Sequence, residues 1–151
     1  MMRFHLIDRV DSWEPGRRLT GRKATAPDET YWAASGHGPV MPGGLVLEAL
    51  AQAGTWLLLM STDYRRRAAL GSVAKAAWHR DVVPGDILEM DVTLLSHDDT
   101  AAVLDGTVRV GGETVLKADG VMCAVVDSAL LEDPADTARM GRQLLGAEAL
   151  R

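Results

Sequence analysis

The sequence has few of the residues that form disulfides or bind metals. Its 151 residues include one cysteine, Cys123, and four scattered histidines. A single cysteine cannot form an intramolecular disulfide, and its apolar setting in VMCAVV predicts a buried, unreactive thiol. Because no group of these residues has the spacing of a metal site, we expect no metal. A reducing, cytoplasmic setting fits this composition.

Positive charge is also scarce. Lysine and arginine number 16 against 21 aspartates and glutamates, which gives a formal net charge of -5. Nucleic-acid binding needs a basic footprint, so this composition argues against it. The glycine pair in GGLVLE lacks the spacing and the basic residue of a phosphate-binding loop.

The chain lacks an apolar run of the membrane-spanning type. The stretch Leu45–Met60 is strongly apolar, but it is shorter than the roughly 20 residues that a spanning helix needs. It also contains Glu48 and Gln52. The opening MMRFHLIDRV has no basic region followed by a long apolar stretch, so we expect no signal peptide. We interpret residues 45–60 as the buried helix of a soluble protein that does not contact a membrane.

The first half of the sequence predicts strands, a loop and one long helix. A chain of this length with 47% hydrophobic residues can bury one core, so we expect one main domain. Residues 4–13 and 17–25 have strand patterns, and residues 31–44, rich in Gly and Pro, predict an ordered loop. The helix is expected to start at Pro42 or Gly43 and to end near Tyr64, where the following arginines would face the negative end of its dipole.

The second half is mostly strand-like. Residues 87–94 alternate between apolar and polar side chains, and residues 103–110 and 113–126 flank Gly111–Gly112, a two-residue hairpin signal. Since a lone apolar helix needs a sheet around it, we expect an α+β fold in which an antiparallel sheet wraps the helix. We place this domain at residues 1–127. A C-terminal helical extension, started by Asp133 and Pro134, would cover residues 128–151.

Three polar residues stand out in the apolar helix. Glu48, Gln52 and Thr55 are spaced i, i+4 and i+7, so they lie along one stripe. One reading is that the stripe is the solvent edge of the helix. The other is that Glu48 borders an apolar cavity, where desolvation suits a carboxyl group to acid/base work. The free amides at the helix start could then polarise a carbonyl oxygen.

Two motifs resemble a known family. GPVMPGGLVLEALAQAG is similar to the active-site segment of the 3-hydroxyacyl-[acyl-carrier-protein] dehydratases of the FabZ and FabA type, and VVPGD at residues 82–86 resembles a second segment of that family. The likeness runs from Phe4 to Val126. It implies a hotdog fold, a dimer with substrate tunnels between subunits, and the elimination of water from a 3-hydroxyacyl thioester to give a trans-2-enoyl product.

The resemblance also implies roles for individual residues. Glu48 matches the catalytic acid, and Gly43 matches the residue whose amide binds the oxyanion. Gln52 matches a supporting glutamine. We assign the remaining motif positions and one tryptophan to substrate binding, namely Met41, Pro42, Gly44 and Trp78. No cofactor is implied, because the substrate is carried as a phosphopantetheine thioester on an acyl carrier protein or on CoA.

The sequence departs from the family at the catalytic histidine. Counted back from Glu48 without a gap, that position is Ala34, and with one inserted residue it is Ala33. The nearby His37 is a candidate replacement if the loop has rebuilt the site. The alternative, which we favour, is that His37 is a loop histidine that binds backbone or solvent.

Several functions stay open at this point. In the family the histidine and the acid come from different subunits, so a chain with only the acid could complete a site with a histidine-bearing hotdog partner. An inactive structural partner and altered chemistry are the other outcomes, and a homodimer stays possible if His37 acts. The pathway would be fatty-acid or polyketide biosynthesis. A hotdog thioesterase and a non-catalytic module that binds acyl thioesters or carrier protein are the alternative functions.

Overall fold

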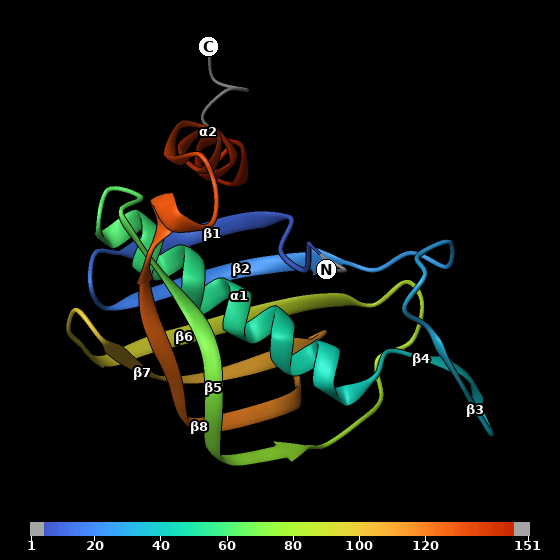
Figure 1. Ribbon diagram of the computed structural model, residues 1–151. Coiled ribbons are helices and arrows are strands. Elements are labelled where there is room, and N and C mark those ends of the chain that lie inside the picture. The colour runs from blue at the N-terminus through green and yellow to red at the C-terminus, as the bar shows by residue number, and fades with distance from the viewer. Residues whose placement is uncertain (1–4, 147–151) are drawn as a thin grey trace.

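The computed structural model describes residues 5–146 and has the expected α+β hotdog architecture, a curved antiparallel sheet around one long helix (Figure 1). In chain order the elements are β1 (Arg9–Glu14), β2 (Arg18–Ala24), β3 (Ala33–Ser35), β4 (Gly38–Val40), α1 (Gly43–Ser61), β5 (Arg66–Trp78), β6 (Ile87–His97), β7 (Ala101–Val110), β8 (Glu113–Asp127), the 3-10 helix η1 (Ser128–Leu130) and α2 (Pro134–Leu144). The main sheet has the order β1-β2-β6-β7-β8-β5, and β3 and β4 form a separate hairpin.

The helix α1 forms the centre of the core. It begins at Gly43, directly after Pro42, as predicted, because a proline is tolerated where the first helical amides have no partner anyway. From Ala53 to Met60 every residue is buried, and fully burying a leucine stabilises a fold by roughly 1.5–3 kcal/mol. The expectation that this stretch is too short to span a membrane is corrected, since α1, at 19 residues, is the one helix among residues 5–146 that is long and apolar enough to do so. Even so, 67% of its most apolar part is buried in this fold, as expected for a core helix.

The sheet turns one apolar face toward α1. Along β6 the predicted alternation is confirmed, since Leu88, Met90, Val92 and Leu94 are all buried. The predicted hairpin also forms: Gly111 and Gly112 have φ angles of 57° and 80° and join β7 to β8. Positive φ at both turn positions matches the twist of the paired strands.

Two glycines lie at tight contacts between α1 and the sheet. A β-carbon at Gly106 of β7 would lie 2.9 Å from the Leu50 side chain and 3.0 Å from the backbone oxygen of Asp91. On the helix, a β-carbon at Gly54 would lie 2.5 Å from Leu104. These two positions therefore set the distance between α1 and the sheet.

We expect Gly106→Ala to lower the free energy of unfolding by about 1–3 kcal/mol, since the added methyl group meets backbone that cannot turn away. Denaturant unfolding measures this loss. Gly36→Ala is the matched control, because a β-carbon there meets nothing within 4 Å. Equal stability of both variants would show that the helix can move away from the sheet without cost.

The predicted end of α1 is wrong. The helix ends at Ser61, and Thr62 caps it by donating its amide to the Leu58 and Leu59 carbonyls. Asp63 and Tyr64 then reverse the chain with φ angles of 54° and 62°. Of the arginines after this turn, Arg65 faces the helix terminus as predicted, since its side chain donates a hydrogen bond to the carbonyl of the capping Thr62 at 3.2 Å, whereas β5 already begins at Arg66.

Two predictions before α1 are also corrected. The first strand starts at Arg9, because the amide of the buried Leu6 bonds to the Gln52 side chain of α1 and not to a strand; Phe4 lies outside the described residues. Residues 31–44 are not all loop, since β3 and β4 pair within them. The Ser35 hydroxyl closes their turn by donating to the Gly38 carbonyl at 2.6 Å.

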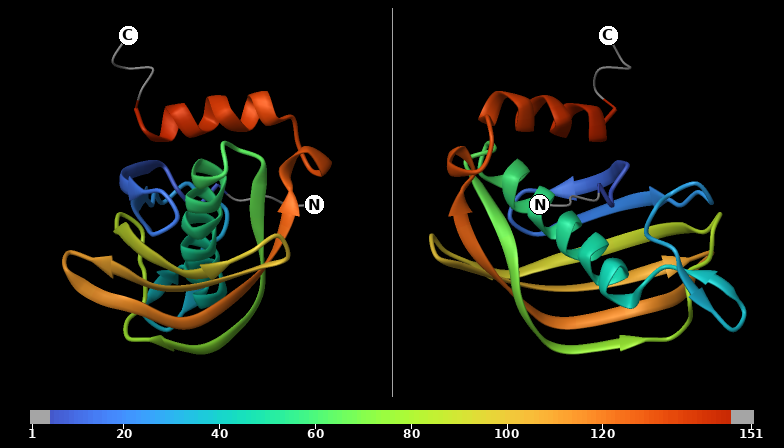
Figure 2. Two further views of the ribbon diagram at one scale, coloured as in Figure 1. Left: turned by 90° about the vertical axis from the view of Figure 1, so that its left-hand side faces the viewer. Right: turned by 45° about the vertical axis from the view of Figure 1, so that its right-hand side comes forward.

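The helix α2 lies across the end of α1 (Figure 2). Asp133 caps α2 as predicted, because its carboxylate accepts a hydrogen bond from the Ala135 amide at 2.9 Å. Gly141 of α2 faces the Tyr64 ring so closely that a β-carbon would lie 2.5 Å from the phenol oxygen. The division into a domain of residues 1–127 and an extension of residues 128–151 stays a prediction.

Candidate active site

The start of α1 presents unpaired backbone donors. The first amides of a helix have no intrahelical partner. Here the Leu45 and Val46 amides fold back onto the Pro42 carbonyl, whereas Gly43 and Gly44 donate no hydrogen bond within residues 5–146. Gly43 therefore offers an amide to an oxygen atom of a bound molecule, as its predicted role requires.

Glu48 lies one turn further along α1. Its side chain is half-buried, while Ala49, Leu50 and Ala51 beside it are buried. Among the described residues it has no hydrogen bond or ion pair. The Cys123 thiol on β8 has a raised pKa. Burial is the main cause, and the electrostatic effect of Glu48 adds to it. An unpaired carboxylate thus borders apolar surroundings one turn from the Gly43 amide.

The rest of the polar stripe binds backbone. Thr55 is buried and donates its hydroxyl to the Ala68 carbonyl of β5 at 2.7 Å, so the stripe is not simply a solvent edge. Gln52 accepts a hydrogen bond from the Leu6 amide at 2.8 Å. Its side chain therefore holds the N-terminal segment against α1, and a contact between Gln52 and substrate stays a prediction.

The other predicted binding residues gather at the same helix start. Met41 is buried, Pro42 is half-buried and Gly44 is exposed. Trp78, at the end of β5, is 47% exposed and donates its indole N–H to the Gly43 carbonyl at 3.0 Å. The structure thus places these residues around Gly43, although they are up to 37 positions apart in the sequence.

His37 lies apart from this group. It occupies the exposed turn of the β3–β4 hairpin, which projects away from the main sheet (Figure 1). Its amide bonds to the Ser35 hydroxyl at 3.2 Å, and its imidazole has no partner within the described residues. Ala33 and Ala34, at the family's histidine position, pair with β4 in the same hairpin. No described histidine forms a hydrogen bond or ion pair with Glu48.

We expect His37→Ala to change the turnover of an acyl thioester less than twofold, because the imidazole contacts neither Glu48 nor the Gly43 turn. Steady-state kinetics of the purified variant test this in whichever pairing of subunits is active. A loss of a hundredfold or more, with folding and dimerisation intact, would show that the hairpin carries the missing base.

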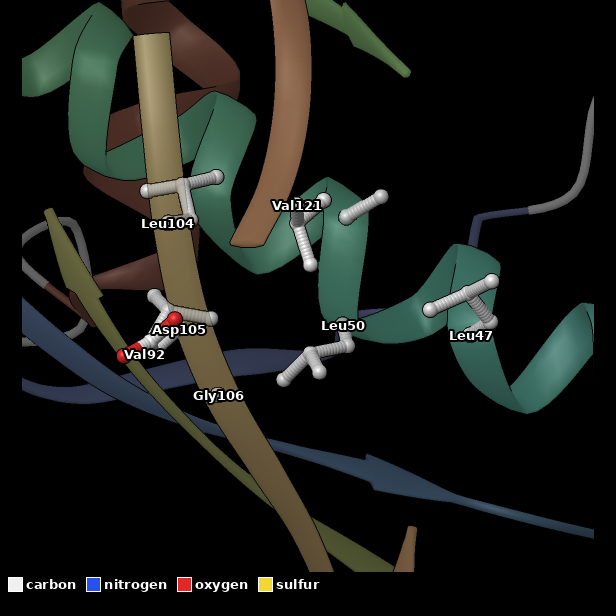
Figure 3. Close-up of a pocket in the computed structure, with 8 residues that line it drawn as sticks. Leu47, Leu50, Val92, Leu104, Asp105, Gly106 and Val121 are labelled. Carbon is white, nitrogen blue, oxygen red and sulfur yellow. The ribbon is translucent and has the colours of Figure 1, made fainter. Parts of the chain in front are cut away.

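A small apolar cavity lies between α1 and the sheet (Figure 3). Its volume is about 10 Å³, which is roughly the room for one water molecule. Leu47, Leu50 and Ala51 of α1 line it from one side. From the sheet it is lined by Val92, Leu104, Asp105, Gly106 and Val121. This cavity is too small to hold an acyl chain.

Two contacts near the helix start and the hairpin were not predicted from the sequence. Val82 accepts the Met41 amide through its backbone carbonyl at 2.9 Å, and no residue pattern reports such a bond. Lys23 is buried between Glu29 and Asp8, at 3.3 Å and 3.7 Å, and so anchors the segment that leads to the hairpin. Lysine is normally exposed, so its burial could have been predicted only by knowing that two carboxylates lie beside it in the fold.

The chain is similar to a family of known function. A family model described as the FabA-like domain matches residues 1–119. A 3-hydroxyacyl-[acyl-carrier-protein] dehydratase FabZ from Moorella thermoacetica is 39% identical over 125 residues, which cover 82% of this chain and 86% of that protein. FabZ from Clostridium kluyveri is 38% identical over 112 residues, covering 72% of this chain and 76% of the relative.

Solved structures support the fold. A Streptococcus mutans protein bound to acetyl-CoA has a TM-score of 0.61 at 20% identity, covering 82% of this chain and 92% of that one. A thioesterase from Haemophilus influenzae has a TM-score of 0.60 at 14% identity, covering 82% of this chain and 79% of the other. At such identities the likeness concerns the fold alone.

Proposed function

The chain belongs to the FabA-like family, and we propose that it is a 3-hydroxyacyl-thioester dehydratase subunit in which Glu48 handles one of the two protons of the elimination. The observation that carries the proposal is the half-buried Glu48 carboxylate, which has no partner within residues 5–146, one helical turn from the Gly43 amide, which donates no hydrogen bond within the same residues. The family's curated members at 32–39% identity, named as FabZ dehydratases, support the reaction class.

In the proposed elimination, the Gly43 amide and the Glu48 carboxyl group have different tasks. Removing the C2 proton and the C3 hydroxyl forms the C2–C3 double bond, and the hydroxyl leaves as water with one added proton. The Gly43 amide would bind the thioester oxygen, which gains charge as the C2 proton leaves. Glu48 would protonate the leaving hydroxyl, or take up the C2 proton if a second group supplies the other. The reaction needs that second group, and Glu48 has none among the residues it contacts.

A different hotdog subunit would supply the second group. In the family the acid and the histidine of one site come from two subunits, and this chain has alanines at the histidine position. A heterodimer with a histidine-bearing partner therefore completes a site that two copies of this chain would leave incomplete. An inactive structural subunit and altered chemistry rank below this arrangement.

The sheet edge supports a dimer. β5 is 13 residues long and lies at the edge of the main sheet, so one row of its backbone groups is available to another strand. Its Leu70 and Trp78 are 38% and 47% exposed although both are large and apolar. Pairing of β5 with the same edge of another hotdog subunit would cover both features and would bring a second chain close to the Gly43 turn.

The substrate would be an acyl group on phosphopantetheine, attached to an acyl carrier protein or to CoA, in cytoplasmic fatty-acid or polyketide biosynthesis. Arginines 65–67 are a weak candidate for docking an acidic carrier protein. Arg66 pairs with Asp99 and Arg67 with Glu132, so much of their charge is balanced within the chain.

Product analysis tests the reaction class. Incubated with a 3-hydroxybutyryl thioester in its active pairing, the chain should give the trans-2-enoyl thioester, seen as the loss of one water in the mass spectrum. Release of the free acid and thiol would instead indicate a thioesterase. An unchanged substrate that still binds would indicate a non-catalytic acyl-thioester module.

A further inference from the structure

The two motifs that are distant in the sequence meet at the start of α1. The segment from Trp78, the last residue of β5, to Asp86 contacts the Met41–Gly44 turn at two points. The Val82 carbonyl accepts the Met41 amide at 2.9 Å. The Trp78 indole N–H donates to the Gly43 carbonyl at 3.0 Å. One segment therefore binds the chain on both sides of Pro42, directly at the start of α1.

The holding segment is itself fixed. The Asp86 carboxylate accepts hydrogen bonds from the Val83 amide at 3.0 Å and from Arg80 at 3.1 Å. The Asp86 carbonyl accepts the hydroxyl of the buried Thr25 at 2.6 Å, and a second guanidinium nitrogen of Arg80 bonds to Glu113 at 3.2 Å. These contacts tie the segment to Thr25, directly after β2, and to the start of β8, so it can act as a rigid support.

The turn needs such a support because of its composition. Gly43 and Gly44 are consecutive glycines, which have more conformational freedom than any other residue. A β-carbon at Gly44 would meet nothing within 4 Å. At Gly43 it would lie 3.0 Å from the indole nitrogen of Trp78 and 3.3 Å from Cε2, so the indole lies directly against this glycine.

We propose that Trp78 is a positioning residue, whose indole N–H fixes the Gly43 turn so that the Gly43 amide is held ready for the thioester oxygen. This differs from the substrate-binding role that the sequence suggested. It rests on the proposed function, because only there does the direction of the Gly43 amide affect a rate.

Trp78→Phe tests the role, since it keeps an aromatic ring against Gly43 and removes the N–H donor. Trp13→Phe is the matched control, because the Trp13 indole has no hydrogen-bond partner within the described residues. In Trp78→Phe we expect the ¹⁵N order parameters of Gly43 and Gly44 to fall from about 0.85 toward about 0.6. In the control Trp13→Phe these order parameters should not change. We expect kcat to fall about tenfold while KM stays within about twofold of the wild-type value. A misplaced amide would stabilise the transition state less and would leave the binding of the ground-state substrate unchanged.

Each other outcome overturns the proposal. Unchanged order parameters would show that the N–H does not hold the turn. A raised KM with unchanged kcat would return Trp78 to substrate binding, and a looser turn with unchanged kcat would make the contact purely structural. If no pairing of subunits dehydrates a thioester, the dehydratase proposal fails by itself, and with it the catalytic role of Trp78. The order parameters would still show whether Trp78 holds the turn.

Discussion

Replacing Glu48 by glutamine should lower the proposed dehydration rate by about a hundred- to ten-thousand-fold, the range typical of positioned acid/base groups. The substitution keeps the shape of the side chain and removes its proton transfer. Since Glu48 makes no hydrogen bond or ion pair within the described residues, its loss should leave the fold intact. Initial rates with a 3-hydroxyacyl thioester, in the active pairing of subunits, measure the effect.

Glu89→Gln is the matched control for this experiment. Glu89 is exposed on β6 and has no ion pair among the described residues, so its rate should stay within about twofold of the wild type. Equal denaturant midpoints for all three proteins would show that folding is not the cause. An unchanged rate in Glu48→Gln would assign Glu48 to structure and remove the basis of the proposed mechanism.

The second large effect concerns the subunits. Purified alone, the chain should turn over 3-hydroxyacyl thioesters at least about a hundredfold more slowly than when mixed with a histidine-bearing hotdog partner, because in the proposed composite site the partner supplies one of the two proton-transferring groups. Rates across a titration of the partner, with subunit exchange followed by native mass spectrometry, measure this difference. Rapid dehydration by the chain alone would restore an active homodimer.

The elements that could be predicted from the sequence are those with a clear local signal, such as a regular alternation of apolar and polar residues or a turn-forming pair. The start of α1 at Gly43, the alternation along β6 and the Gly111–Gly112 hairpin all follow from local chemistry that the core reinforces. The strand β5 was not recognised, because an edge strand with many small and exposed residues has no clear alternation. Its arginines were instead read as the end of the helix.

The site was predictable as a set of residues but not as a set of contacts. Glu48 and Gly43 stand out by residue type and spacing, and the structure places them one turn apart on α1. The bonds from Trp78 to Gly43 and from Gln52 to Leu6 join segments 35 and 46 positions apart, and such pairings depend on the tertiary fold alone.

Complementation between two defective subunits tests the composite site most directly. A histidine-bearing hotdog partner whose own catalytic acid is replaced by glutamine would be inactive alone. Mixed with this chain, it should recover dehydration, because its histidine and Glu48 of this chain would share one site. Recovery should be absent when this chain carries Glu48→Gln. If the wild-type chain forms the heterodimer yet restores no dehydration, Glu48 does not complete a shared site and the proposed function is wrong.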